Sequence, residues 1–224
     1  MRYFPVNLDI RGKLAVIVGG GAVAARKCLT LLAAGARVMV IAPILAAPLR
    51  ELAEKETVTH LARKFARGDL AGAFLVFAAT DSRMVNRTVA QEAREYGILA
   101  DIADAPELSA FTSPAVLTRG ELLLTVSTGG ASPALARKIR AELEMRYGPE
   151  YGAALKLLGK VREKLLTGNA GNSYNKQIFI RLAEHDLPAL LKSGSTAEID
   201  HLLLDLCGPG FTLAELGMGE KDSE

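Results

Sequence analysis

Short apolar runs alternate with amphipathic segments along the N-terminal half of the chain. The apolar runs are rich in β-branched residues and predict four buried strands, at 13–20, 37–42, 73–80 and 98–104. The segments between them repeat apolar residues at helical spacing and predict three helices, at 22–35, 48–56 and 82–97. Strands that alternate with helices in this way form βαβ units, so we expect a parallel sheet covered on both faces.

The pattern changes near residue 114. Residues 115–128 predict two strands joined in a hairpin at Arg119-Gly120. From Ser132 onward the apolar spacing predicts helices only, at 133–147, 150–166, 173–192 and 195–207. The stretch TGNAGNS (167–173) has loop composition, and GMGEKDSE at the end predicts a frayed tail. The fold class is therefore α/β: a Rossmann-like parallel-sheet domain (1–112), a small hairpin segment (113–148) and an all-helical C-terminal domain (149–224).

The first predicted strand runs directly into three glycines, in KLAVIVGGGAVAARKC. Gly19, Gly21 and Ala24 fit G-x-G-x-x-G/A after a strand and at the start of a helix, as the dinucleotide fingerprint requires. Gly19 is expected to make the tight turn. Gly21 would let the backbone approach a pyrophosphate that the helix N-terminus stabilises. The alternative is a strand-to-helix turn that binds nothing.

The second predicted strand ends in IAPIL (41–45), without the residues that commonly distinguish the two nicotinamide dinucleotides. It carries no Asp or Glu for the ribose hydroxyls and no Arg for a 2′-phosphate. Adenosine contacts are then expected from the backbone or from residues around Pro43 and Ile44. The fingerprint alone does not choose between NAD and NADP, but the lack of an arginine at this strand end favours NAD.

Composition narrows the class of protein further. Half of the 224 residues are hydrophobic, and the formal net charge of +2 argues against a general nucleic-acid or membrane-surface role. Cys28 and Cys207 lie far apart, which suits a reducing compartment and leads us to expect a cytoplasmic protein. No apolar stretch is long enough to cross a membrane, and cleavage of a secretory signal would remove the first strand. His60, His185 and His201 are scattered, so no metal site is predicted.

Four stretches together resemble one family: VGGGAVAARK (18–27), AATDS (78–82), IADAPELSAF (102–111) and STGGASPALARKIR (127–140). At these separations the chain is similar to the precorrin-2 dehydrogenase/sirohydrochlorin ferrochelatase family of siroheme synthesis. The resemblance runs from about residue 3 to 205. It implies NAD-dependent oxidation of precorrin-2 to sirohydrochlorin, Fe²⁺ insertion to give siroheme as in many members, and a homodimer with dimerisation through the hairpin segment. It also implies a standalone module without the methyltransferase fused to some members.

The resemblance implies roles for individual residues. By position, Ala22 and Val23 match the family's pyrophosphate-loop contacts, and Pro43 and Ile44 match its adenosine-side contacts. Asp104 matches its general acid/base carboxylate, which makes it the expected catalytic residue. Taken with the glycine motif, the expected cofactor-binding set is Gly19, Gly21, Ala22, Val23, Pro43, Ile44 and Thr80.

A tetrapyrrole substrate carries many carboxylates, and a basic stretch follows the hairpin. Residues 127–164 hold eight Lys and Arg against four Glu, and arginine suits a bidentate grip on carboxylates. The STGG stretch before a helix is a plausible anion nest, although helix-start chemistry and a solvated helix face explain the same residues. The expected substrate-binding set is Thr128, Gly129, Gly130, Arg137 and Lys138. Thr128 also falls where some members carry a serine that is phosphorylated.

The chain departs from the family pattern at two places. Asp101 stands where many members have Asn, and Thr112-Ser113 stands where bulkier apolar residues are common. Asp101 and Asp104 differ by an odd number, so a regular strand would direct them to opposite sides. We expect only one to face the cofactor cleft, and the family match selects Asp104. The alternative is that Asp104 merely begins the turn into Ala105-Pro106.

Other functions stay open at this point. A regulatory protein that senses NAD would explain the glycines and the helices, but not DAPELSAF or the basic stretch. An unrelated NAD(P) dehydrogenase and a family member without chelatase activity are further alternatives. A homodimer is also expected from the apolar stripes ALKLLGKV and IDHLLLDL, which a sheet domain would not cover alone.

Overall fold

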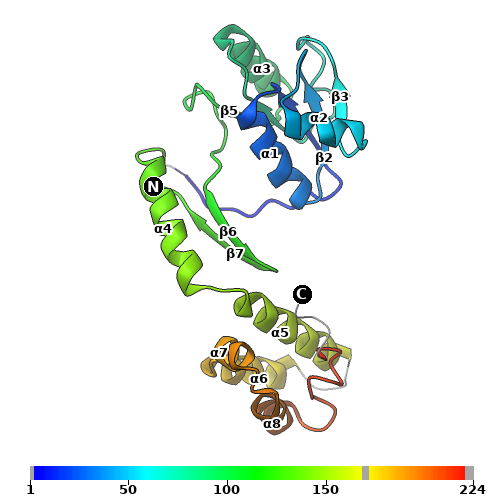
Figure 1. Cartoon of the computed structure of the whole chain (residues 1–224), viewed down its shortest axis with the longest axis vertical. Helices are drawn as coiled ribbons and strands as arrows, with labels where there is room; N and C mark the ends of the chain where they lie inside the picture. Colours follow the sequence, from blue (N-terminus) through cyan, green and yellow to red (C-terminus); the bar gives the residue numbers. More distant parts are fainter. Residues whose placement is uncertain (1–2, 168–171, 220–224) are drawn as a thin grey trace. The chain divides into compact units, whose positions relative to one another are not determined.

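A computed structural model describes residues 3–167 and 172–219, with the backbone alone described at 172–175. The chain divides into two compact units, Met1–Ser113 and Pro114–Glu224, and each is described by itself (Figure 1). The elements of the first unit are, in chain order, β1 (Leu14–Val18), α1 (Ala22–Ala33), β2 (Arg37–Ile41), α2 (Ala47–Glu54), β3 (Thr59–Leu61), β4 (Leu75–Ala78), α3 (Arg83–Glu95) and β5 (Leu99–Ile102).

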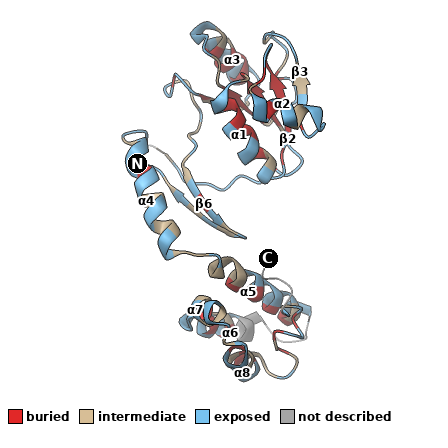
Figure 2. Cartoon of the chain, viewed as in Figure 1, coloured by how far each residue is buried: buried red, intermediate tan, exposed pale blue. Residues whose placement is uncertain are grey.

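The first unit is a parallel five-stranded sheet in the order β3-β2-β1-β4-β5. Alternate strand residues face opposite sides. Ile17 and Phe77 pack with α1 and α2, whereas Val16 and Val76 pack with α3. Figure 2 shows the buried residues where the helices meet the sheet. The predicted α/β fold with both faces covered is confirmed. The chain passes from one side of β1 to the other, so the crevice for a ligand is expected at the carboxyl ends of β1 and β4.

The sequence did not predict strand β3. It has three residues, THL, and pairs in parallel with the end of β2 through Met39↔Thr59 and Ile41↔Leu61. So short an edge strand leaves no periodicity to detect. The other strands of this unit lie where they were predicted. Strand β5 stops at Ile102, however, so Asp104 lies in the turn beyond it.

The second unit consists of an antiparallel hairpin followed by helices. Its elements are β6 (Ala115–Arg119), β7 (Leu122–Val126), α4 (Pro133–Arg146), α5 (Glu150–Thr167), α6 (Asn172–Glu184), α7 (Leu187–Ser193) and α8 (Thr196–Cys207). The hairpin register pairs Arg119 with Leu122, so the predicted turn is confirmed. Leu157, Leu182 and Leu203 belong to the apolar core that the last four helices share. The further division of this unit into a hairpin segment and a helical domain stays a prediction.

The single helix predicted over 173–192 is wrong. The structure forms two helices, α6 and α7, and the second begins at Leu187. The Asp186 carboxylate caps α7 by accepting from the Ala189 N–H at 3.1 Å. Pro188 fits the first turn of a new helix because it has no N–H to offer to a preceding turn. The loop expected at 167–173 and the tail expected at 217–224 fall partly on 168–171 and 220–224, outside the described residues.

Candidate dinucleotide site and adjacent carboxylates

The glycine loop after β1 is held between two neighbouring loops. Gly19 has a φ of +130°, and a Cβ there would collide with the Ala79 backbone beyond β4. A Cβ at Gly20 would collide with the Ile44 carbonyl in the loop after β2. Packing therefore requires both glycines, and the backbone conformation is a second requirement at Gly19 alone. The loop lies at the carboxyl edge of the sheet, where the topology places the ligand crevice.

Gly21 has no such requirement. Its φ is −84°, which any residue adopts, and a Cβ there would meet nothing within 4 Å. It is the N-cap of α1 and provides no side-chain cap. The first N–H groups of this helix, including those of Ala22 and Val23, have no intrahelical partner. Open space in front of uncapped donors fits a pyrophosphate, so these residues fit a dinucleotide as the sequence predicts.

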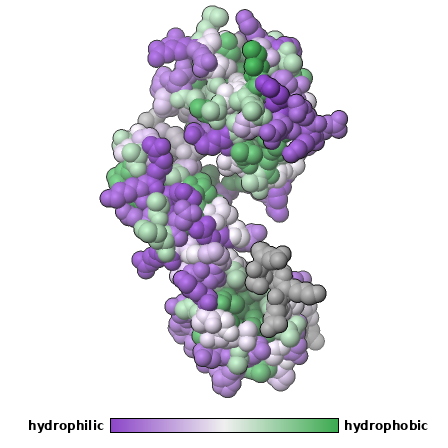
Figure 3. Space-filling view, viewed as in Figure 1, coloured by the Kyte–Doolittle hydropathy of each residue, from purple (hydrophilic) through white to green (hydrophobic). Residues whose placement is uncertain are grey.

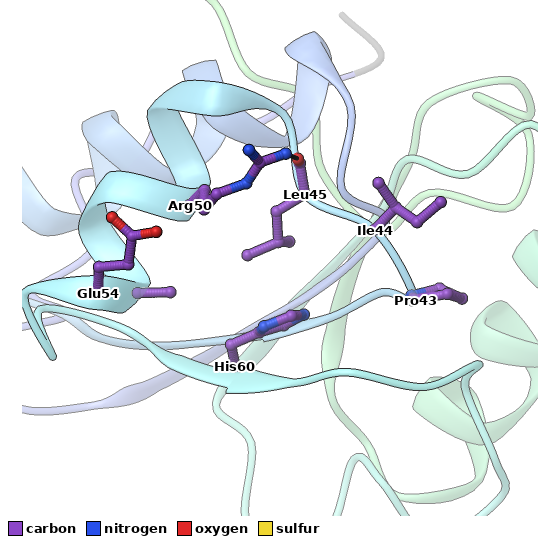
Figure 4. A pocket seen from close by; sticks show the side chains of 7 residues that line it. Pro43, Ile44, Leu45, Arg50, Glu54 and His60 are labelled. Atoms are coloured by element: carbon purple, nitrogen blue, oxygen red, sulfur yellow. Dashed lines mark hydrogen bonds between the residues drawn. The ribbon is translucent and has the colours of Figure 1, made fainter.

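A pocket of about 520 Å³ opens beside the carboxyl end of β2 (Figure 4). Its lining residues come from the loop after β2, from α2 and from β3: Pro43, Ile44, Leu45, Arg50, Ala53, Glu54 and His60. The Arg50 guanidinium donates to the Leu45 carbonyl at 3.2 Å, and His60 Nε2 lies 2.9 Å from the Ala42 carbonyl. Pro43 and Ile44, expected on the adenosine side, thus line a pocket at the correct end of the sheet.

Arg50 and His60 were missed in the sequence. The arginine does not belong to the end of β2 itself but to helix α2, one turn into it. His60 reaches the pocket from β3, the strand that the sequence did not reveal. Arg50 lines the pocket at this strand end, so the lack of an arginine on the strand itself no longer favours NAD over NADP. A helix that follows a Rossmann-type second strand is where such an arginine could have been sought.

A second group of polar residues lies across the carboxyl edge, on the α3 side. Thr80 follows β4, Asn86 is on α3, and Asp104 follows β5. The Asn86 amide donates to Asp104 Oδ1 at 2.7 Å and to the Thr80 carbonyl at 3.0 Å. The Asp104 side chain is 31% exposed, and its Oδ2 lies 3.9 Å from Arg83 Nε. The loop after β4 and the turn after β5 therefore meet through one amide on α3.

Asp104 also lines a small pocket of about 130 Å³, together with Arg83, Arg87, Ala105 and Glu107. The two arginines are one helical turn apart on α3 and lie on one face of it. The small pocket therefore combines the Asp104 carboxylate with two guanidinium groups that can attract an anionic ligand.

Asp101 occupies the opposite side of the sheet. Its Oδ2 accepts from Lys27 Nζ of α1 at 2.8 Å and from the Ser113 hydroxyl at 3.1 Å. The same ammonium group lies 4.8 Å from the centre of the Phe77 ring. The prediction that Asp101 and Asp104 face opposite sides is confirmed, although the strand ends before Asp104 and the turn completes the separation.

The residues expected to bind substrate all belong to the second unit. The Thr128 hydroxyl accepts from the Ser132 N–H at 3.1 Å, and the Ser127 hydroxyl accepts from the Gly129 N–H at 3.3 Å. Gly129 and Gly130 both have positive φ, at 63° and 89°. This is the geometry of a tight helix start, and it uses Thr128 and the Gly129 N–H within the loop.

Arg137 and Lys138 are both exposed on α4. As neighbours on a helix they point about 100° apart, so they do not form one grip. Lys138 lies 3.9 Å from Glu142 one turn along. Arg140 pairs with Glu144 at 3.1 Å, which neutralises part of the expected positive excess.

The cysteines do not supply a nucleophile at this site. Burial raises the pKa of the Cys28 thiol, and it raises that of Cys207 to about 11. Both thiols are therefore protonated at neutral pH.

Among residues 3–167 and 172–219, His, Cys, Asp and Glu side chains form no group of three or more that could hold a metal ion. Over the same residues, none of the helices combines the length and apolarity needed to cross a membrane.

The parallel sheet, its glycine loop and the uncapped start of α1 define an NAD(P)-binding protein of the Rossmann type. Residues 6–115 match the family model described as "Putative NAD(P)-binding", and residues 119–145 match the one described as "Sirohaem biosynthesis protein central". The chain belongs to the siroheme-synthesis family that combines these two modules, the precorrin-2 dehydrogenase/sirohydrochlorin ferrochelatase family.

Individual relatives are similar over most of the chain. A siroheme synthase of Chromobacterium violaceum is 45% identical over 152 residues, which cover 68% of this chain and 32% of that protein. Siroheme synthase 3 of Aeromonas hydrophila is 36% identical over 227 residues, covering 99% of this chain and 48% of that protein. The chain thus spans half or less of the length of these curated relatives. The solved structure of SirC, precorrin-2 dehydrogenase, matches with a TM-score of 0.72 and 27% identity, covering 84% of this chain and 92% of that one.

Proposed function

We propose that this protein oxidises precorrin-2 to sirohydrochlorin, with NAD⁺ as the hydride acceptor. One observation carries the proposal: an uncapped glycine loop and a partly exposed carboxylate, Asp104, share the carboxyl edge of one parallel sheet. The name of the SirC structure and the names of the siroheme synthase relatives support precorrin-2 as the substrate.

The reaction removes a hydride and a proton from the tetrapyrrole, and it yields sirohydrochlorin, NADH and a free proton. When bound, the dinucleotide supplies the hydride acceptor. The open space at Gly21 and the free N–H groups of Ala22 and Val23 would hold its pyrophosphate. The proton passes to Asp104, whose Oδ1 is held by Asn86 and whose Oδ2 lies 3.9 Å from Arg83 Nε.

The experiment is an anaerobic mixing of the purified protein with precorrin-2 and NAD⁺. We expect NADH and sirohydrochlorin to form in equal amounts. An NAD-sensing regulatory protein would bind NAD⁺ and leave precorrin-2 unchanged. An unrelated dehydrogenase would also leave precorrin-2 unchanged and would reduce NAD⁺ with some other compound.

We infer that the same site inserts Fe²⁺ into sirohydrochlorin. Insertion requires the pyrrole N–H groups to lose their protons, and Asp104 is a carboxylate that can accept them. The test supplies sirohydrochlorin and Fe²⁺ anaerobically without NAD⁺. Siroheme formation above the rate without protein supports the second activity. The absence of siroheme would leave a dehydrogenase without chelatase activity.

We propose that Thr128, Gly129, Gly130, Arg137 and Lys138 contribute to binding the substrate carboxylates. The exposed position of the two basic side chains supports this role. Arg137→Gln should raise the KM for precorrin-2 and leave the affinity for NAD⁺ unchanged. An unchanged KM would remove Arg137 from the site.

We also propose a cytoplasmic homodimer. Apolar side chains are interspersed with polar ones over the surface of the second unit (Figure 3). Val116, Leu123, Leu135 and Met145 are exposed on the hairpin and on α4, and Met145 is 83% exposed. Exposed apolar residues on adjacent elements are typical of an interface. Light scattering at micromolar concentration should give twice the chain mass, and a monomeric mass would contradict the dimer.

A further inference from the structure

Asn86 is one of two buried polar side chains among the described residues, and it is 1% exposed. The other, Glu92, accepts from the Gly68 and Leu70 N–H groups and so fixes a surface loop. Asn86 instead reaches the carboxyl edge of the sheet. Its position on α3 places one amide between the loop after β4 and the turn after β5.

Each hydrogen-bonding position of this amide is used. Nδ2 donates to the Thr80 carbonyl at 3.0 Å and to Asp104 Oδ1 at 2.7 Å. Oδ1 accepts from the Thr80 N–H at 3.3 Å and from the Thr80 hydroxyl at 2.7 Å. The Thr80 hydroxyl has one proton to donate. Asn86 Oδ1 is its nearer acceptor, and the Ser82 carbonyl is more distant, at 3.2 Å. A backbone N–H can only donate and a carbonyl can only accept, so the partners fix which way the amide points.

We propose that Asn86 is a positioning residue for the proton transfer, an inference that rests on the proposed role of Asp104. The amide ties Oδ1 of Asp104 to the Thr80 loop, on which a cofactor contact is expected. It thereby leaves Oδ2, which lies toward the small pocket lined by Arg83 and Arg87, as the oxygen that receives the substrate proton. A buried amide with every position satisfied is a rigid support, because any rotation breaks several hydrogen bonds at once.

Asn86→Asp is the sharpest change because it keeps the shape of the side chain. It retains an acceptor for Thr80 but faces Asp104 with an oxygen in place of the donor. We expect kcat to fall by about 10²-fold, as when a reacting group is misplaced, with a small change in KM. Thr88→Val, which removes a hydroxyl bonded to the Met84 carbonyl on the same helix, should keep the parent kcat.

A double-mutant cycle separates positioning from general damage to the fold. If Asn86 acts through Asp104, Asn86→Asp should lower kcat no further in a protein that already carries Asp104→Ala. A further loss of similar size in that background would overturn the proposal. So would a parent-like kcat in the single variant.

A measurement without turnover keeps this inference separate from the proposed function. In ¹⁵N NMR spectra, Asp104→Ala should shift the side-chain amide protons of Asn86 and the backbone N–H of Thr80, whereas Asp101→Asn should leave both in place. If the parent protein fails to oxidise precorrin-2, the proposed function is wrong and these spectra still decide whether Asn86 holds Asp104. Unshifted Asn86 protons in Asp104→Ala would contradict the contact.

Discussion

Two carboxylates at the end of strand β5 have opposite surroundings. Asp101, on the α1 side, meets the ammonium group of Lys27 at 2.8 Å, and its side chain is 16% exposed. Asp104, on the α3 side, is held by the neutral amide of Asn86, and its nearest cation is Arg83 at 3.9 Å. Only two residues of chain separate a carboxylate that is paired with an ammonium group from one that is held by a neutral amide.

The difference indicates how one strand end can provide both structure and chemistry. A close ammonium group satisfies the charge of Asp101 and connects β5 to α1. A neutral donor fixes Asp104 without cancelling its charge, so this carboxylate can still receive a proton. The Lys27 pair shows how this chain accommodates an acid at position 101.

Asp104→Ala should have the largest effect on turnover. Loss of a positioned general acid/base typically lowers the rate by ~10²–10⁴-fold. We expect this loss in kcat for precorrin-2 oxidation, and in any chelatase activity, with NAD⁺ binding and the melting temperature retained. Asp101→Asn should have a far smaller effect on kcat. An active Asp104→Ala together with an inactive Asp101→Asn would reverse the comparison.

Gly21→Val tests whether the α1 side of the crevice binds the cofactor. The new side chain meets no protein atom within 4 Å, so the fold should remain. It would block access to the first N–H groups of α1. Two lost hydrogen bonds to a charged group, at about 1.5–3 kcal/mol each, correspond to NAD⁺ affinity weakened by ~10²–10⁴-fold. Calorimetric titration measures this, and unchanged affinity would mean that the glycine loop is only structural.

Gly19→Val is the matched control for that experiment. It places a side chain against the Ala79 backbone at a φ of +130°, so it should destabilise the domain itself. A lower melting temperature is expected for Gly19→Val and not for Gly21→Val. Equal melting temperatures would mean that positions 19 and 21 tolerate a side chain equally well.

Lys27→Met tests the structural role of Asp101. It leaves a partly buried carboxylate without its cation, and we expect a cost of about 1.5–3 kcal/mol, the value of a hydrogen bond to a charged group. Urea denaturation measures the change in unfolding free energy. Lys27→Met combined with Asp101→Leu should recover part of the loss, because no unpaired charge remains. A parent-like midpoint for the single variant would mean that the ion pair does not stabilise the unit.

Arg50→Leu should have the smallest effect and concerns the choice of dinucleotide. We expect the parent to prefer NAD⁺, since Glu54 lines the same pocket and would repel a 2′-phosphate. Arg50 is an exposed cation, and an ion pair between exposed groups contributes about 0.2–1 kcal/mol. Removing it should lower kcat/KM with NADP⁺ by up to about 5-fold more than with NAD⁺. Equal losses with both cofactors would exclude a role in this choice.

The sequence was informative where the structure depends on local pattern. Gly19 and Gly21 follow a strand and open a helix, so the crevice could be predicted from adjacent residues. The Lys27–Asp101 pair and the contact between Asn86 and Asp104 join segments 74 and 18 residues apart, and no local pattern reveals them. The break before α7 could have been found, because Asp186 and Pro188 form a recognisable helix start.

The most direct test of the account is a crystal structure of the protein with NAD⁺ bound. We predict that the pyrophosphate lies against the N–H groups of Ala22 and Val23, with the adenosine in the pocket lined by Pro43 and Ile44. The nicotinamide should then lie on the side of Thr80 and Asp104. A dinucleotide bound in the reverse direction, with its nicotinamide in the Pro43 pocket, or bound away from the glycine loop, would contradict the proposed site.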